Sequence, residues 1–254
     1  MLTPPRLFVA SLVVAAAVTG LAVSVPFQGT VLLATLPYLL QVCGGAAAAF
    51  TFERGDRLRW AWLSIALGGF VGGLSCLALS RPPLHTPIAE VAYSRTVMHL
   101  SLLGDLLINV FIVTGIVILA QAWRSLGPLP RWYNLAAVIA LAAGLLLVGP
   151  SLYRALPLAA GGDLQAWSAV ISMIGDLAVI AMVGPLAVTA LSMRGGALAW
   201  PYLFLSIGAA CWLFFDASGL LRGRLQLIAD LFFAASGLIF TGAAGLAHRR
   251  AIPR

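Results

Sequence analysis

The chain has 254 residues, 61% of them hydrophobic and only 9% charged, whereas soluble domains carry about 25% charged residues, so that class is excluded. The 15 basic residues outnumber 8 acidic ones, but they are arginines that separate apolar runs and form no basic patch, which excludes nucleic-acid binding. The absence of lysine excludes Schiff-base chemistry.

Apolar runs of membrane-spanning length fill most of the chain. The hydrocarbon layer of a bilayer is about 30 Å thick and requires about 20 apolar residues in a helix. The sequence therefore predicts an all-α integral membrane protein, a bundle of about eight transmembrane helices within a single transmembrane domain, residues 1–254. The expected helices are approximately 7–25, 30–52, 58–79, 97–123, 132–148, 165–193, 198–215 and 225–248.

The arginines predict the orientation of this bundle. With the N-terminus inside, ten arginines fall on cytoplasmic segments and five on outer ones, and cytoplasmic loops are enriched in positive charge. We therefore expect both termini in the cytoplasm. The inner set is Arg6, Arg54, Arg57, Arg59, Arg124, Arg131, Arg194, Arg249, Arg250 and Arg254, and the outer set is Arg81, Arg95, Arg154, Arg222 and Arg224. The composition, rich in Arg, Ala and Leu, is typical of a bacterial protein, and we expect the bacterial inner membrane.

Two long outer loops are expected, one after the third helix and one after the fifth. The first, residues 80–93, contains Pro82, Pro83 and His85. The second follows residue 148 and includes Pro157, Gly161 and Gly162, which break helices.

The even-numbered helices share a short pattern: an apolar residue, a small residue, Asp or Thr, then Leu. The third position of this pattern is Thr35, Asp105, Asp176 or Asp230, and an arginine follows 18 or 19 residues later. The spacing is 70, 71 and 54 residues. We interpret the pattern as four repeated helical hairpins in the same orientation, as in the parallel repeats of some transporters.

The aspartates of this repeat allow two interpretations. Each lies about 28 Å before its arginine, near the outer edge of the hydrocarbon layer, where an Asp in the first turns of a helix is stabilised by the helix dipole. Alternatively, polar residues spaced by four extend each aspartate into a polar face. If the faces converge, close carboxylates repel, and we expect one to hold a proton. The candidates for ion or ligand binding are Asp105, Asp176, Asp230, Asn109, Ser101, Ser172, Gln226 and Thr35.

Enzyme and cofactor motifs are weak. Gly104-Asp105 and Gly175-Asp176 resemble the Gly-x-Gly-Asp motif of intramembrane aspartyl proteases, but Leu102 and Met173 replace its first glycine, and Tyr-Asp does not occur. His99 is the only histidine positioned as a haem ligand, and the other ligands of a haem site are missing. No metal site and no cofactor are predicted.

The sequence therefore favours a non-enzymatic protein. Our first hypothesis is a subunit of a membrane complex, or a membrane-embedded sensory module, that acts through a protein partner in the lipid bilayer. The alternative is a small proton- or cation-coupled transporter that uses an outward-facing aspartate cluster. The two differ in depth, because a transporter needs a polar site near the middle of the membrane.

Overall fold

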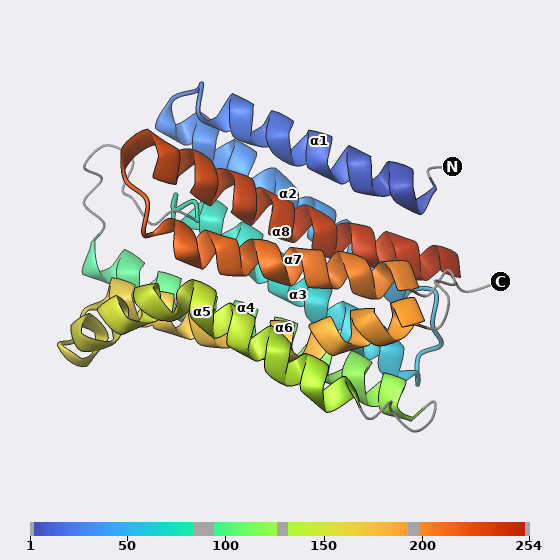
Figure 1. Cartoon of the computed structure of the whole chain (residues 1–254). Helices are drawn as coiled ribbons and strands as arrows, with labels where there is room; N and C mark the ends of the chain where they lie inside the picture. The colour runs from blue at the N-terminus through green and yellow to red at the C-terminus, as the bar shows by residue number, and fades with distance from the viewer. Residues whose placement is uncertain (1–2, 84–93, 126–131, 193–198, 252–254) are drawn as a thin grey trace.

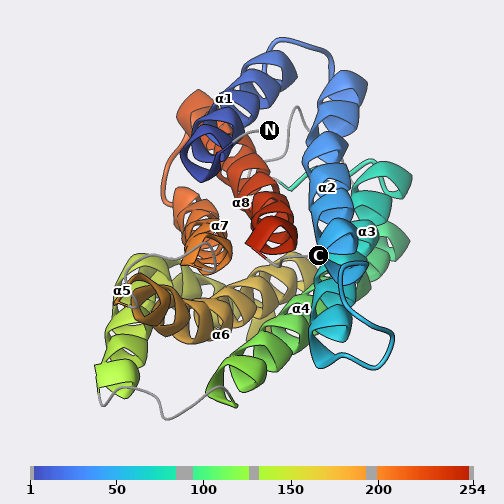
Figure 2. The same ribbon diagram turned by 90° about the vertical axis from the view of Figure 1, so that its right-hand side faces the viewer.

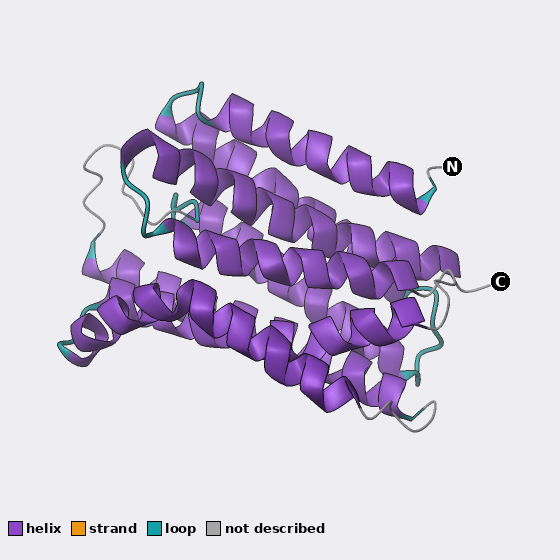
Figure 3. Cartoon of the chain, in the orientation of Figure 1, coloured by secondary structure: helices purple, strands orange, loops and turns teal. Residues whose placement is uncertain are grey.

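A computed structural model describes residues 3–83, 94–125, 132–192 and 199–251. This part of the chain is helical, apart from short turns (Figure 3). The helices are α1 (Pro4–Ala22), α2 (Phe27–Ala49), α3 (Arg57–Ala78), α4 (Arg95–Arg124), α5 (Trp132–Ala160), α6 (Leu164–Ser192), α7 (Ala199–Ser218) and α8 (Gly223–Ala251). All eight are long and apolar enough to cross a membrane. Except for the end of α5, their bounds lie within about one turn of the prediction.

The prediction for the end of α5 is wrong. An outer loop was expected after residue 148, but the helix continues to Ala160 and contains Pro150 and Pro157. A proline removes one backbone hydrogen bond and does not necessarily end a membrane helix, because neighbouring groups can satisfy the freed carbonyl. Pro37 in α2 and Pro185 in α6 also lie inside their helices.

A short turn connects α5 to α6. Gly162 has a φ of 90°, a conformation that side chains disfavour, which explains the glycine. The next residue, Asp163, caps α6: its carboxylate accepts hydrogen bonds from the backbone N–H groups of Gln165 at 2.8 Å and Ala166 at 3.1 Å. These contacts fix the start of a helix that carries several of the candidate residues.

The helices alternate in direction, so the bundle has two distinct ends (Figure 1). We call the end with the α1–α2, α5–α6 and α7–α8 turns the hairpin end, and the opposite end, where both termini lie, the terminal end. The even-numbered helices all run from the hairpin end to the terminal end. Arg131, Arg194 and Arg254 of the predicted orientation, and His85, lie outside the described residues.

Six of the helices form a closed ring. Going around it, α2 packs on α3, α3 on α4, α4 on α6, α6 on α7, α7 on α8, and α8 on α2 again (Figure 2). Helix α1 lies outside this ring against α8 and α2, and α5 lies outside against α6 and α7. The ring helices therefore surround a common axis, whereas α1 and α5 are peripheral.

Close packing holds the ring together at its α2–α8 contact. A methyl group on Gly44 of α2 would overlap the backbone of Gly242, and one on Gly245 would overlap the backbone of Gly44. Small residues allow membrane helices to approach closely, and van der Waals contact then stabilises the pair. Phe204 and Phe240, both fully buried, extend the core from this contact toward α7.

An aromatic cluster occupies the terminal end of the ring. Trp62 of α3 donates a hydrogen bond from Nε1 to Nδ1 of His248 on α8, at 2.8 Å. Tyr202 of α7 packs edge-on against Trp123 of α4, with ring centroids 4.9 Å apart, and lies 6.4 Å from the ring of His248. These four residues, the terminal-end aromatic cluster, come from four ring helices and are at most 9% exposed.

Candidate functional site

The ring encloses a cavity of about 450 Å³. All six ring helices and the end of α5 line it, and at the hairpin end its lining includes the exposed residues Arg154, Asp163 and Gln165. The cavity therefore begins at the surface of the hairpin end and continues into the bundle. Its volume lies within the range of about 300–1,000 Å³ that is typical of small-molecule sites.

The cavity extends well past the middle of the shorter helices. Leu205 lines its floor and is six residues from the start of α7, about 9 Å along the helix from the terminal end. Ile65, eight residues into α3, lies about 12 Å from that end. The floor is mostly apolar: Ile116 of α4 lies at the same depth as Ile65, and so does Gln41 of α2, whose amide donates a hydrogen bond to the Ile65 carbonyl at 2.9 Å. Trp62 and Tyr202 of the terminal-end aromatic cluster lie one turn nearer the terminal end than Ile65 and Leu205. This cluster closes the cavity.

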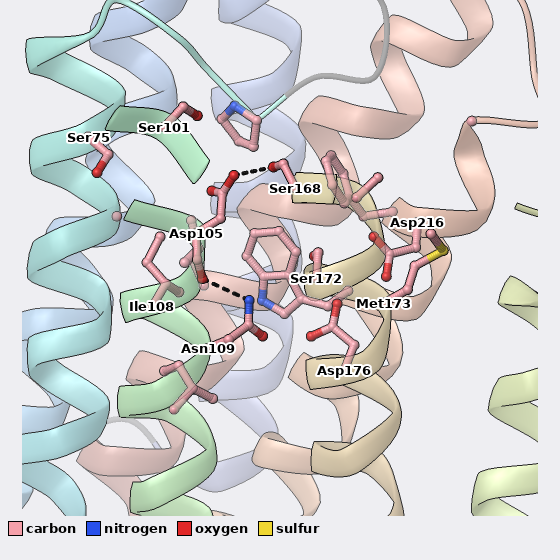
Figure 4. A pocket seen from close by; sticks show the side chains of 18 of the residues that line it. Ser75, Ser101, Asp105, Ile108, Asn109, Ser168, Ser172, Met173, Asp176 and Asp216 are labelled. Atoms are coloured by element: carbon pink, nitrogen blue, oxygen red, sulfur yellow. Dashed lines mark hydrogen bonds between the residues drawn. The ribbon is translucent and has the colours of Figure 1, made fainter. Parts of the chain in front are cut away.

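Two aspartates from neighbouring helices meet in the part of the cavity nearer the hairpin end. Asp176 of α6 and Asp216 of α7 interact with each other, and Ser172 lies one turn from Asp176 and interacts with both (Figure 4). One oxygen of each carboxylate, Oδ2, is buried and has no hydrogen-bond partner among the described residues. The interactions found at this pair involve Ser172 and the other carboxylate, and no basic side chain.

Asp105 lies on α4, on the other side of the cavity, and interacts with several polar side chains (Figure 4). It accepts a hydrogen bond from the hydroxyl of Ser168 on α6, and Arg81 attracts its carboxylate. Arg81 also donates a hydrogen bond to Ser101. Asp105 is therefore held by a polar network near the mouth, in contrast to the pair formed by Asp176 and Asp216.

The predicted site residues divide into two groups. Asp105, Asp176, Asn109, Ser101, Ser172 and Gln226 line the cavity. Asp230, fully buried, accepts a hydrogen bond from Ser218, and Thr35 interacts with Cys76 of α3 at 3.5 Å; neither lines the cavity. His99 is exposed on α4 and does not line the cavity either.

No protein-family model, curated protein or solved structure matches the chain. The arrangement of the site itself is therefore the basis for any functional proposal.

Asp216 was not among the predicted residues. The seventh apolar run was expected to end at Phe215, which placed this aspartate in a loop, but α7 continues to Ser218. An ionisable residue within or beside a membrane helix is a functional candidate by default, and that rule alone would have included Asp216.

Two of the aspartates lie too far along their helices to be stabilised by the helix dipole, which was the first interpretation of their position. Asp105 and Asp176 lie 10 and 12 residues after the first residue of α4 and α6, about 15 and 18 Å along these helices. The helix dipole acts mainly within the first turn, so it does not account for these carboxylates.

The pair of carboxylates has a limited chemical repertoire. Two carboxylates in a cavity of low dielectric repel each other unless a proton or a cation lies between them. Such a pair can hold and release a proton, bind a cation, or act as an acid and base on a bound substrate. No group of three or more His, Cys, Asp or Glu side chains in the described ranges is arranged to hold a metal ion.

Proposed function

We propose that the protein is a small secondary transporter that takes up a solute from the hairpin end and couples its passage to a proton or cation at Asp176 and Asp216. The supporting observation is the cavity, which combines two incompletely partnered carboxylates with a floor about 9 Å from the terminal ends of the shorter helices. Asp216 lies two residues before the hairpin end of α7, so it is the cavity below the carboxylate pair that reaches the depth at which transporter sites lie between repeated helices. This depth of the cavity favours transport over the non-transporting hypothesis.

The charge distribution supports placing the terminal end in the cytoplasm. Of the described arginines, seven lie near the terminal end and five near the hairpin end, a bias in the direction expected for cytoplasmic loops. The hairpin end, with the mouth of the cavity, then faces outward. We retain the bacterial inner membrane as the proposed location.

The contacts of the ring helices support an internal repeat. The neighbours α2–α3 and α3–α4 recur as α6–α7 and α7–α8, and the contact α4–α6 recurs as α8–α2. The first helix of each half, α1 or α5, lies outside the ring. We infer that the four predicted hairpins form two halves, α1–α4 and α5–α8, related by an axis along the bundle, as in parallel-repeat transporters.

The register of the cavity supports the same relation. Several residues of α3 that line the cavity have a counterpart on α7 that is 140 positions later in the sequence. Residues of α4 have counterparts on α8 that are 125 positions later. The pairs are Ile65 and Leu205, Gly72 and Trp212, Ser75 and Phe215, Cys76 and Asp216, Ser101 and Gln226, and Ile116 and Thr241. With the same shifts, the contact of Trp62 with His248 corresponds to that of Tyr202 with Trp123.

This relation suggests how the cavity changes its access. In the structure the mouth lies at the hairpin end and the terminal-end aromatic cluster closes the other end. Trp62 and His248 belong to different halves, as do Trp123 and Tyr202, so rocking one half against the other would separate both contacts. The carboxylate pair would then face the terminal end and release its proton or cation there.

Thiol accessibility tests this proposal without knowledge of the substrate. The three cysteines, Cys43, Cys76 and Cys211, are first replaced by serine or alanine. Ala209→Cys then introduces a single thiol into the cavity near its floor. A membrane-impermeant methanethiosulfonate is added to one side of oriented vesicles, and then to the other. A transporter exposes this thiol in turn to both sides, so we expect modification from both.

Two matched variants define the sides. Ser24→Cys, exposed in the α1–α2 turn, should react only from the hairpin end, and Glu53→Cys, exposed before α3, only from the terminal end. Modification of Ala209→Cys from the hairpin side alone, with both controls correct, would contradict transport.

A subunit or sensory module is the second candidate, and the peripheral helices favour it. α5 has a largely exposed apolar face, with Leu146 83% exposed and Val138 62% exposed. In a bilayer such a face packs against lipid or against a partner protein. One-sided labelling, together with a protein that co-purifies in stoichiometric amount, would support this function instead.

A further inference from the structure

We propose that the ligand of the cavity is a small amphipathic organic amine, whose ammonium group binds between Asp176 and Asp216 and whose apolar part extends toward the floor. This inference names the substrate class of the proposed transporter and rests on that function only in requiring that the cavity admits a solute.

The carboxylate pair supplies the site for the ammonium group. The Oδ2 atoms of Asp176 and Asp216 are buried hydrogen-bond acceptors without a partner among the described residues, and both residues line the cavity. Asp105 differs, because Ser168 and Arg81 already interact with it. A primary ammonium donates up to three hydrogen bonds and carries a positive charge, so it can compensate a carboxylate pair with which no basic side chain interacts.

Apolar side chains continue directly from this pair. Trp212 precedes Asp216 by four residues on α7, so it lies about one turn from its aspartate toward the floor. Met173 precedes Asp176 by three residues on α6, about one turn toward the mouth, and both residues line the cavity. Trp212 also packs edge-on against Phe215, with ring centroids 5.4 Å apart. The Trp212 ring, on the floor side of the pair, offers an apolar face on which the hydrocarbon part of an organic amine can pack.

The polarity of the cavity fixes the orientation of the ligand. Asp216 lies 11 residues from Leu205 on α7, so the pair is about 16 Å above the floor. The floor residues Ile65, Ile116 and Leu205 are apolar, and the Gln41 amide beside them already donates a hydrogen bond to the Ile65 carbonyl, so the floor favours burial of hydrocarbon. A bare metal ion or sodium ion would leave most of the 450 Å³ unfilled and this floor without a partner.

Calorimetric titration of the full chain in lipid nanodiscs tests the class with four probes. These are 2-phenylethylamine, with charge and ring; ethylamine, with charge alone; 2-phenylethanol, with ring alone; and sodium chloride. We expect 2-phenylethylamine to bind about tenfold or more tightly than each of the others. Asp176→Asn combined with Asp216→Asn should weaken its binding by a similar factor, while Glu53→Gln, exposed at the terminal end, should leave it unchanged.

A second variant separates loss of the site from loss of the fold. Trp212→Leu should weaken 2-phenylethylamine and leave ethylamine unchanged, because only the first ligand reaches the ring. Equal binding of 2-phenylethanol and 2-phenylethylamine would overturn the role of the carboxylates, and equal binding of sodium or ethylamine would overturn the amphipathic class. Each result concerns the ligand alone, because two-sided labelling of Ala209→Cys tests transport independently.

Discussion

Four aspartates lie within the ring helices, and their partners differ. Asp230 is fully buried and accepts a hydrogen bond from Ser218, and Asp105 is held by Ser168 and Arg81. Asp176 and Asp216 instead each keep one oxygen without a partner among the described residues. A buried charge without compensation is destabilising, and proteins retain such groups mainly at functional sites.

One substitution applied to two residues tests this difference. Asp216→Asn removes charge from an incompletely satisfied pair, so we expect the midpoint of thermal unfolding to rise by about 2–4 °C, equivalent to about 1 kcal/mol. Asp230→Asn replaces the carboxylate that accepts from Ser218 by a neutral amide, whose NH2 group adds two donors at a fully buried position, and the midpoint should fall by a similar amount. Differential scanning fluorimetry of both variants measures the shifts. The same sign for both would contradict the proposed division between site and structure.

At the scale of the helices, glycines determine how closely α2 and α8 approach. Gly44 of α2 meets Gly242 and Gly245 of α8 with no room for a side chain. This contact joins the first half of the chain to the second and closes the ring. A larger residue there would separate the two helices along their length.

Substitution of one of these glycines should therefore be costly. Gly44→Ala forces a methyl group into the backbone of Gly242, and we expect the free energy of unfolding to fall by about 1–3 kcal/mol, as for overpacked cores. Gly20→Ala in α1 is the matched control, because no atom lies within 4 Å of the added methyl group. Thermal unfolding of both variants measures the difference, and equal midpoints would refute the close contact.

The apolar runs predicted the number of helices because an apolar segment about 20 residues long has few alternatives to a spanning helix. The continuation of α5 through Pro150 and Pro157 was not predictable, because the tolerance of proline depends on neighbouring groups. The pairing of Asp176 with Asp216 was not predictable either. It depends on the order of helices around the ring, which the pattern of one helix does not contain.

At the scale of the whole molecule, the cavity is open at one end and closed at the other. The terminal-end aromatic cluster provides the closure, with Trp62 fully buried and hydrogen-bonded to His248. The barrier is thus about one turn of helix below the apolar floor. In the proposed transport cycle, the strength of this barrier should determine how often the cavity opens to the terminal end.

Weakening the barrier should increase that opening. Trp62→Phe leaves Nδ1 of His248 without its donor, and we expect a loss of about 1–3 kcal/mol in unfolding free energy. Modification of Ala209→Cys from the terminal side should become faster in the same chain. Trp60→Phe is the control, because Trp60 is 59% exposed and should affect neither measurement. An unchanged rate of modification in Trp62→Phe would exclude this cluster as the barrier.

Each half of the proposed repeat has four helices, three in the ring and one outside it, and an even number brings each half back to the end at which it started (Figure 1). A tandem copy of such a unit inserts into the membrane the same way up as the original, without any reversal of its flanking charges. Gene duplication and fusion could therefore produce the ring in one step. In the proposed repeat, Thr35 and Cys76 stand where the second half has Asp176 and Asp216, so later divergence would have left the carboxylate pair to one copy alone.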